Sequence, residues 1–245
     1  MSHHKIEARN LEYIYPDGNK ALADISFLIT HGESVGVIGA NGAGKSTLLM
    51  TLMGVLFPTS GQVLVGDVFV TKKTLPIVRQ HLGLVFQNPD DQLFMTTVYD
   101  DVAFGPRNYH LSEEEVEKRV MDALCVVGIP HLKDRAPYKL SGGEKRSAAI
   151  ACVLSMQPDA LVLDEPTSGL DPKARRRAMA LLKGFAHTKI IASHDIDMIY
   201  ELCERTIVIQ DGTIRADGKT ADIVLDRALM DDCGLEIPLA YQNCL

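Results

Sequence analysis

The segment SVGVIGANGAGKS at residues 34–46 constrains the fold of this chain more than any other stretch of its sequence. Its first six residues are almost all apolar, which is typical of a short strand buried on both faces of a parallel sheet. Its last eight residues, GANGAGKS at 39–46, match the pattern G-x-x-x-x-G-K-[ST], and TLLMTLMGVL then continues with helical character. A strand, a glycine-rich loop and a helix in this order predict an α/β fold with a phosphate-binding loop, the P-loop.

The residue types in this loop suit a nucleotide phosphate. Backbone N–H groups of such a loop form a nest around the phosphates, Lys45 can reach the β- and γ-phosphates, and Ser46 can hold Mg²⁺. The alternative is a glycine-rich turn that binds nothing, and the strand before and the helix after it favour the nucleotide. The motif by itself indicates a bound nucleotide and nothing more specific. The residues predicted to contact the nucleotide here are Gly39, Asn41, Gly42, Ala43, Gly44, Lys45, Ser46 and Thr47.

A second apolar run, ALVLDEP at 160–166, places two carboxylates at the end of a predicted strand. Open α/β sheets bind ligands at this edge. Asp164 suits a role holding Mg²⁺, directly or through water, and Glu165 can act as the general base that activates a water. The alternative is an ordinary acidic loop, since many parallel strands end in one. Two other predicted strand ends carry candidates: Gln87 for Mg²⁺ or water, and His194 for the γ-phosphate.

The heptapeptide LSGGEKR at 140–146 has two readings. Ser141 and Glu144 have the spacing of a helix capping box. This explains the ends of the motif but not Gly142 and Gly143, each of which costs a helix about 1 kcal/mol relative to alanine. Glycines at a helix N-terminus suit an anion that must approach the bare backbone. The motif therefore predicts an anion at Ser141.

The remaining pattern predicts an α/β core with a helical insertion. The core covers 1–94 and 158–220 and starts with an antiparallel β region, whereas 95–157 reads as a helical subdomain that contains LSGGEKR and a capping box at Ser112 and Glu115. Residues 221–245 are weakly periodic and receive no role. Strands are predicted in the ranges 6–15, 25–29, 34–39, 82–87, 160–164, 189–193 and 206–210, with a hairpin over 61–70 that turns at Gly66-Asp67.

Composition narrows the class of protein. Apolar residues make up 46% of the 245, enough for a sizeable core, and the net charge of −7 argues against nucleic acid or an anionic membrane as a partner. Five scattered cysteines predict reduced thiols. No apolar run approaches the ~18 residues that span a bilayer. We expect a chain that is soluble by itself and reaches a membrane only through a partner.

Taken in order, GANGAGKST, Gln87, LSGGEKR, LVLDEP, SGLD (168–171) and SHD (193–195) resemble the ATPase subunits of ATP-binding cassette (ABC) transporters. The resemblance covers almost the whole chain. It implies a RecA-like P-loop core, bound ATP and Mg²⁺, and a head-to-tail pair in which LSGGE of one chain closes on ATP held by the other. It further implies that Asp171 signals across the dimer and that Tyr15 stacks on adenine, with Tyr13 as the alternative.

A closer resemblance lies in LVFQNPDDQLF (84–94) and DDVAFGPRN (100–108), which look like the ATPases of energy-coupling factor transporters, particularly for cobalt and nickel. In that group the segment after Gln87 faces a transmembrane coupling protein. The alternative is a solvated acidic loop over a small core. Ser147 departs from the family, which more often has Arg or Gln there. The residues expected to face the partner are Asp90, Asp91, Asp100 and Asp101, with Leu93 and Phe94 as apolar anchors.

These patterns predict an ATP-hydrolysing subunit of an energy-coupling factor importer, peripheral on the cytoplasmic side of the cell membrane. Its expected partners are a second ATPase chain, a transmembrane coupling protein and a substrate-binding membrane component. A homodimer is sufficient because one chain carries every element, and a heterodimer with a sister cassette stays open. Cobalt or nickel is the expected cargo, with a vitamin such as biotin as the alternative. A soluble ABC ATPase acting on DNA or ribosomes is the other class, and the negative charge disfavours it.

Overall fold

The computed structural model describes residues 5–242 and divides into two compact units. The first contains Met1–Leu82, Asp159–Asp164 and Ala186–Leu245, and the second contains Gly83–Pro158 and Glu165–Phe185. The helical subdomain predicted for 95–157 falls in the second unit, which also takes in 83–94 and Glu165–Phe185. LSGGEKR and the P-loop therefore lie in different units.

An antiparallel sheet opens the first unit. It consists of β1 (Ile6–Ile14), β2 (Lys20–Ile29), β4 (Ser60–Val65) and β5 (Val68–Phe69), in the order β2-β1-β4-β5. Val65 pairs with Val68, so β4 and β5 form the hairpin predicted at Gly66-Asp67. The predicted N-terminal antiparallel region is confirmed.

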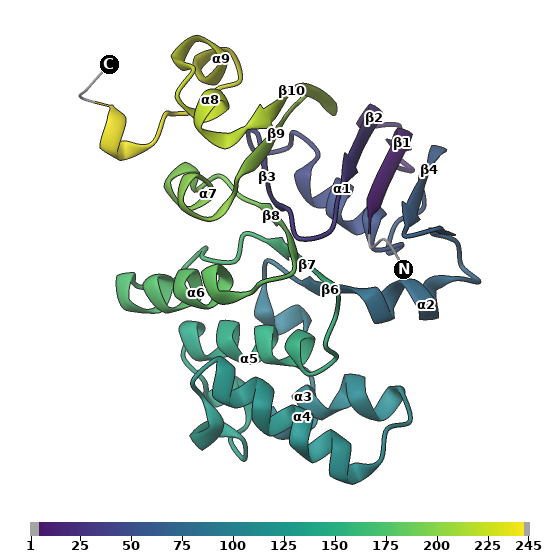
Figure 1. The fold of residues 1–245 in the computed structure, drawn as a ribbon, viewed down its shortest axis with the longest axis vertical. Coiled ribbons are helices and arrows are strands. Elements are labelled where there is room, and N and C mark those ends of the chain that lie inside the picture. Colours follow the sequence, from purple (N-terminus) through teal and green to yellow (C-terminus); the bar gives the residue numbers. More distant parts are fainter. Residues whose placement is uncertain (1–4, 243–245) are drawn as a thin grey trace. The chain divides into compact units, whose positions relative to one another are not determined.

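A second sheet of this unit holds the apolar strands that the sequence marks as parallel. Strand β3 (Ser34–Ile38) lies between β8 (Thr188–Ala192) and β9 (Arg205–Gln210), and β7 (Ala160–Asp164) lies beside β8 (Figure 1). Every residue of β3, β7 and β8 is buried, which explains their nearly continuous apolar sequence. Strand β10 (Thr213–Lys219) returns antiparallel to β9. The helices between these strands are α1 (Lys45–Leu52), α2 (Leu75–His81) and α7 (Ile196–Leu202).

Residues 221–242 belong to the stretch 221–245 to which the sequence assigns no role, and they are folded. With Thr220 they form α8 (Thr220–Val224), α9 (Arg227–Asp232) and a 3₁₀ turn, η4 (Leu239–Tyr241). The hydroxyls of Tyr200 and Tyr241 are 2.9 Å apart, and Leu239 N–H donates to Asp197 at 3.0 Å. The end of the described chain is thus fastened to α7.

The second unit is mainly helical. Strand β6 (Leu82–Val85) starts at the boundary of the first unit, and α3, α4 and α5 pack against one another (Figure 1). Ser112 accepts a hydrogen bond from Glu115 N–H at 3.3 Å, but the Glu115 carboxylate pairs with Arg119 at 2.7 Å instead of closing the predicted capping box. The elements after β6 are η1 (Pro89–Asp91), α3 (Val98–Asn108), α4 (Glu113–Val126), η2 (Pro130–Leu132), η3 (Pro137–Lys139), α5 (Gly142–Leu154) and α6 (Pro172–Gly184).

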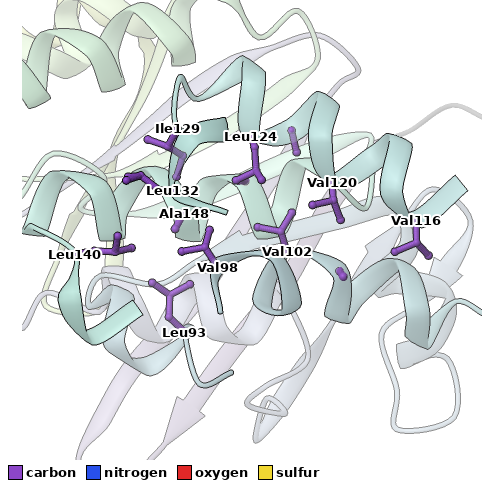
Figure 2. Close-up of a cluster of buried hydrophobic side chains, with 13 residues drawn as sticks. Leu93, Val98, Val102, Val116, Val120, Leu124, Ile129, Leu132, Leu140 and Ala148 are labelled. Carbon is purple, nitrogen blue, oxygen red and sulfur yellow. The ribbon is translucent and has the colours of Figure 1, made fainter. Parts of the chain in front are cut away.

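Thirteen buried side chains fill the space between α3, α4 and α5 (Figure 2). Val116, Val120 and Leu124 recur at helical spacing along α4 and are fully buried, as their periodicity indicates. Leu93 points into the same cluster and is 7% exposed. The prediction that Leu93 is an apolar anchor for a partner is therefore wrong, because it is a core residue of this unit.

Two further predictions concern thiols and membrane spans. Cys125, Cys152, Cys203 and Cys233 are free thiols, as predicted, whereas Cys244 lies outside the described residues. Burial raises the pKa of Cys203 to about 12. Among the helices of residues 5–242, none is long and apolar enough to cross a bilayer.

Candidate functional site

The P-loop follows directly from β3, and its backbone requires glycine. A Cβ at Gly39 would lie 2.2 Å from the carbonyl oxygen of Ile209, and one at Gly44 would lie 2.5 Å from that of Ala21. Gly42 and Gly44 have φ of 82° and 108°, a region that glycine adopts without strain. Gly39 and Gly44 thus pack tightly against neighbouring backbone, whereas Gly42 is required by its positive φ alone.

Lys45 begins α1 and arches back over the loop. It is 8% exposed, and its Nζ donates to the carbonyl oxygens of Gly39 at 2.7 Å and Ala40 at 3.1 Å. No side chain caps the start of α1 at Gly44. The first N–H groups of an uncapped helix and a neighbouring ammonium form an anion site. Ser46, the next residue, is partly exposed beside it.

Tyr15 lies next to this loop. Its hydroxyl is 3.0 Å from the Thr47 Oγ1 of α1. Tyr13 touches the ring of Tyr15 edge to face at 4.9 Å. Of the two tyrosines that the sequence leaves as candidates for the base, Tyr15 is the one that bonds to the helix of the P-loop.

Strand register brings two more candidates to the same edge of the sheet. Ala192 pairs with Val37 on one side and with Asp164 on the other, so β3, β8 and β7 end together. Ser193 N–H donates to Val37 O at 3.1 Å, which holds the start of the SHD segment beside the end of β3. His194 is exposed there, and Asp164 is 7% exposed. The first unit thus gathers the P-loop, Asp164 and His194 at one edge.

Glu165 has an unusual backbone. Within residues 5–242 six non-glycine residues have positive φ, and Glu165, with φ 47° and 6% exposure, is the buried one among them. A left-handed conformation costs a non-glycine residue about 1–3 kcal/mol and persists where the surroundings enforce it, often at functional sites. Glu165, directly after Asp164, is therefore a buried carboxylate on a strained backbone.

The LSGGE turn in the second unit has the predicted capping box. Ser141 N–H and its hydroxyl both donate to the Glu144 carboxylate at 2.8 Å, and Glu144 N–H donates to Ser141 Oγ at 3.4 Å. These bonds hold the pKa of Glu144 below its ordinary value. A Cβ on Gly142 would meet nothing within 4 Å, whereas one on Gly143 would lie 2.9 Å from Ala174 Cβ. The capping box explains Ser141 and Glu144 but gives no local reason for Gly142.

Asp171 lies close to this turn in the same unit. Its carboxylate caps α6 by accepting from Lys173 N–H at 2.8 Å and Ala174 N–H at 3.0 Å, bonds that lower its pKa. Ser141 and Asp171 line one cavity of about 150 Å³ between α5 and α6. Ser147, the departure noted in the sequence, lines the same cavity. The structure therefore brings together the LSGGE turn and the SGLD segment.

The acidic segment after Gln87 differs from its prediction. Asp101 is 4% exposed and accepts from the N–H groups of Phe94 and Met95 at 2.9 and 3.0 Å. Burial raises its pKa, so Asp101 organises the backbone rather than presenting charge, and the prediction of Asp101 as a surface carboxylate is wrong. Phe94 is 63% exposed and meets Phe104, which is 40% exposed, edge to face at 5.0 Å.

The other acidic residues of the segment keep some exposure. Asp91 is exposed, Asp90 pairs with Lys145 at 2.6 Å, and Asp100 pairs with Arg107 at 3.2 Å. Phe104 was not among the residues predicted to face the partner. Its signal lies in DDVAFGPRN, where an aromatic residue follows the buried Val102 and Ala103 on α3. The surface formed by Asp91, Phe94 and Phe104 is called the acidic–aromatic surface below.

Comparisons with known proteins agree with this arrangement. The family model described as "ABC transporter" matches residues 22–168. The chain is 62% identical over 244 residues to a putative ABC transporter ATP-binding protein of Geobacter sulfurreducens, covering 100% of this chain and 98% of that protein.

A second curated relative and a solved structure are more specific. The chain is 46% identical over 238 residues to an energy-coupling factor transporter ATP-binding protein, EcfA, of Methanothermobacter thermautotrophicus, covering 95% of this chain and 76% of that one. A solved structure of cbiO1 from Clostridium perfringens, described as part of the ABC transporter complex cbiONQ, superimposes with a TM-score of 0.82 and 39% identity, covering 95% and 94% of the two chains.

Proposed function

Because this chain belongs to the ABC transporter ATPase family, we propose that its ATP hydrolysis drives an importer of the energy-coupling factor type. The 46% identity to an EcfA protein over 95% of the chain is the observation that carries this proposal. The acidic–aromatic surface supports it, since exposed aromatic and acidic side chains suit a partner helix with arginines. The chain would act on the cytoplasmic face of the cell membrane, in complex with a coupling protein and a substrate-binding component.

We propose cobalt or nickel ions as the cargo of that importer. The support is the resemblance of LVFQNPDDQLF to the ATPases of cobalt and nickel importers. A vitamin such as biotin is the alternative. Co-purification of the chain with its membrane components, followed by uptake of radioactive Co²⁺, Ni²⁺ or biotin into vesicles that contain the complex, decides between them.

In the nucleotide site, we propose that the P-loop binds the triphosphate of ATP. The backbone N–H groups of the loop and of the start of α1 would cradle the phosphates, and Lys45 would leave its carbonyl partners for the β- and γ-phosphates. Tyr15 would stack on adenine beside Thr47. Ser46 and Asp164 are oxygen donors, the kind that Mg²⁺ prefers, and Gln87 would add an amide oxygen. Bound Mg²⁺ would neutralise charge on the β- and γ-phosphates.

For hydrolysis, we propose that Glu165 is the general base and that His194 contacts the γ-phosphate. The enclosed position of Glu165 suits a base that must accept a proton from water in a shielded site. Its strained backbone fixes the carboxylate directly after Asp164. Glu165→Gln should lower steady-state turnover at least 10²-fold while ATP binding persists. Retention of more than about a tenth of the activity would contradict this role.

The LSGGE turn then acts on ATP that is held by a second copy of the chain. Gly142 leaves the turn open, and Ser141 and Asp171 line the cavity beside it. A homodimer of two-fold symmetry suffices because each chain supplies both halves of a site. A heterodimer with a sister cassette is the alternative.

A mixing experiment tests closure between chains. Neither Ser141→Arg nor Glu165→Gln should hydrolyse ATP as a homodimer, because each site then contains one defect. In a mixed dimer both defects fall in one site and the other is sound. A random mixture should recover up to roughly a quarter of wild-type activity under two-fold symmetry. Mixed dimers that form and stay inactive would point to closure within a chain or to strict coupling of the sites, which a mixture of wild type and Ser141→Arg separates.

A pair of surface variants tests the membrane partner. Phe94→Ala should weaken co-purification with the coupling protein and leave the ATPase of the isolated chain unchanged, because Phe94 is exposed and lies outside the nucleotide site. Val126→Ala is the matched control, since Val126 is 64% exposed in the same unit but outside the acidic–aromatic surface. Equal assembly of both variants would exclude this surface as the docking site.

A further inference from the structure

Arg146 of α5 makes contacts that the proposed function does not use. Its side chain is 3% exposed, a rare environment for an arginine. One guanidinium nitrogen donates to Phe86 O at 2.7 Å, and another donates to Gln87 O at 2.6 Å. The two terminal N–H groups of a guanidinium form a rigid fork, so a single side chain fixes two consecutive peptide carbonyls at once.

These carbonyls belong to the residue proposed to bind Mg²⁺ and to the residue before it. The Gln87 side chain itself is exposed, so its direction depends on the backbone that carries it. Beyond β6, which ends at Val85, no strand hydrogen bonds hold this backbone. Arg146 therefore supplies hydrogen bonds where the regular structure ends.

Two further contacts join the same segment to α5. Gln92 donates to Ala149 O at 2.7 Å, and its amide oxygen accepts from Phe86 N–H at 3.4 Å. Lys145 pairs with Asp90 at 2.6 Å. Of these contacts the Lys145–Asp90 pair is the weakest in water, because the side chain of Asp90 is 59% exposed and surface pairs are screened. The bonds of Arg146 are buried and carry a full charge, so they dominate.

We propose that Arg146 is a positioning residue that holds Gln87 in register with the LSGGE helix. Helix α5 begins at Gly142, directly after its Ser141 cap, and carries Arg146 about one turn further on. From there Arg146 binds the backbone of Gln87. The inference rests on the proposed role of Gln87. It adds that a side chain of α5, rather than strand pairing in β6, holds Gln87 in position.

Amide hydrogen exchange of the chain without nucleotide provides a test that is independent of activity. In Arg146→Gln we expect faster exchange over residues 86–92 and unchanged exchange over the P-loop at 39–47. Arg146→Lys keeps the charge but cannot fork to both carbonyls, and should lie in between. Lys145→Ala is the matched control on the same helix, and should speed exchange less than Arg146→Gln because it leaves both carbonyl bonds in place. Unchanged exchange over 86–92 in Arg146→Gln would overturn the proposal.

A double-mutant cycle tests whether Arg146 acts through Gln87. Removal of a group that orients a metal ligand typically lowers activity about 10–100-fold, and we expect this for Arg146→Gln with a higher Mg²⁺ requirement. If Arg146 acts through Gln87, adding Arg146→Gln to Gln87→Ala should lower kcat by less than about twofold more. Reductions that multiply would overturn the proposal while leaving the role of Gln87 intact. Full activity of Gln87→Ala would instead refute that role.

Thermal unfolding curves show whether each variant of the cycle is folded at the assay temperature. Should Arg146→Gln unfold at the assay temperature, Arg146→Lys replaces it in the cycle. The same non-additivity with Gln87→Ala is then expected, although Arg146→Lys alone should lower kcat less than Arg146→Gln does. Additive effects of a folded Arg146→Lys overturn the proposal equally.

Discussion

The P-loop and the LSGGE turn are both glycine-rich starts of helices, yet their glycines have different reasons. In the P-loop, Gly39 and Gly44 lie so close to neighbouring carbonyl oxygens that any side chain would collide with the chain's own backbone. In the LSGGE turn, Gly142 has no neighbour within 4 Å of a Cβ, and its φ is ordinary. The P-loop needs Gly39 and Gly44 in order to fold, whereas the LSGGE turn does not need Gly142.

The contrast extends to the helix ends. The P-loop helix α1 has no side-chain cap, so its N–H groups are left for a ligand. Helix α5 begins with a capping box, in which the side chains of Ser141 and Glu144 each accept a hydrogen bond from the backbone N–H of the other residue. A glycine that is neither required by its own chain nor needed for the cap indicates an approach from outside, which agrees with the proposed second chain. Local packing can thus separate a site that is complete in one molecule from one that is completed by another.

The largest expected effect concerns Gly39. Gly39→Ala would place a methyl group 2.2 Å from Ile209 O at φ 157°, and we expect a loss of more than about 3 kcal/mol in the free energy of unfolding. ATP affinity should fall with it. Urea unfolding and equilibrium ATP binding measure both effects. A variant as stable as wild type would show that the P-loop relaxes more easily than its packing suggests, and the comparison would fail.

A smaller effect is expected at the cap. Glu144→Ala should destabilise the chain by about 0.3–1.5 kcal/mol, the usual worth of one capping interaction. The carboxylate has a lowered pKa in the folded chain, so its contribution is present above the pKa of the unfolded chain and is lost as the pH falls through the folded value. The difference between the unfolding curves of wild type and variant should therefore shrink as the pH falls below the pKa of the unfolded carboxyl. A difference that does not change with pH would assign the effect to another contact.

The smallest and most informative change is Gly142→Ala. We expect it to stabilise α5 by about 0.5–1 kcal/mol, because alanine is the better helix former and the site is open. Its ATPase activity should nevertheless fall, since in the proposed dimer the methyl group would lie where the phosphate held by the second chain approaches. Gly143→Ala is the control: its methyl would meet Ala174 at 2.9 Å, so no stability gain is expected. A Gly142→Ala variant with full activity would leave the glycine unexplained.

The parts predicted well from the sequence are those set by repeating patterns. The buried strands at 34–38, 160–164 and 188–192 each contain an apolar run that leads into a polar motif, so both their type and the edge of the sheet at which Asp164 lies follow from these runs and motifs. The capping box at Ser141 is equally local.

The wrong predictions concern residues for which no hydrophobic periodicity indicates whether the side chain is buried or exposed. Between η1 and α3 the chain is irregular, and there Leu93 is in the core while Phe94 is exposed. In the first turn of α3, Asp101 is buried while Asp100 pairs with Arg107. Which of these side chains is buried depends on tertiary contacts with α4 and α5. Arg146 was missed for the same reason, because its carbonyl partners are some 60 residues earlier in the chain.

The contacts of the P-loop with the β9–β10 hairpin have a consequence for the growing polypeptide. Gly212 N–H donates to Ala43 O, and Ala23 N–H donates to Gly212 O, so the loop is closed by a turn roughly 170 residues later in the sequence. Until the ribosome has released that hairpin, the cradle lacks one wall. A nascent chain that ends before Gly212 therefore carries the complete phosphate motif without the means to shape it. During synthesis this wall is added only after α5 and its LSGGE turn have emerged, because the β9–β10 hairpin follows them in the sequence.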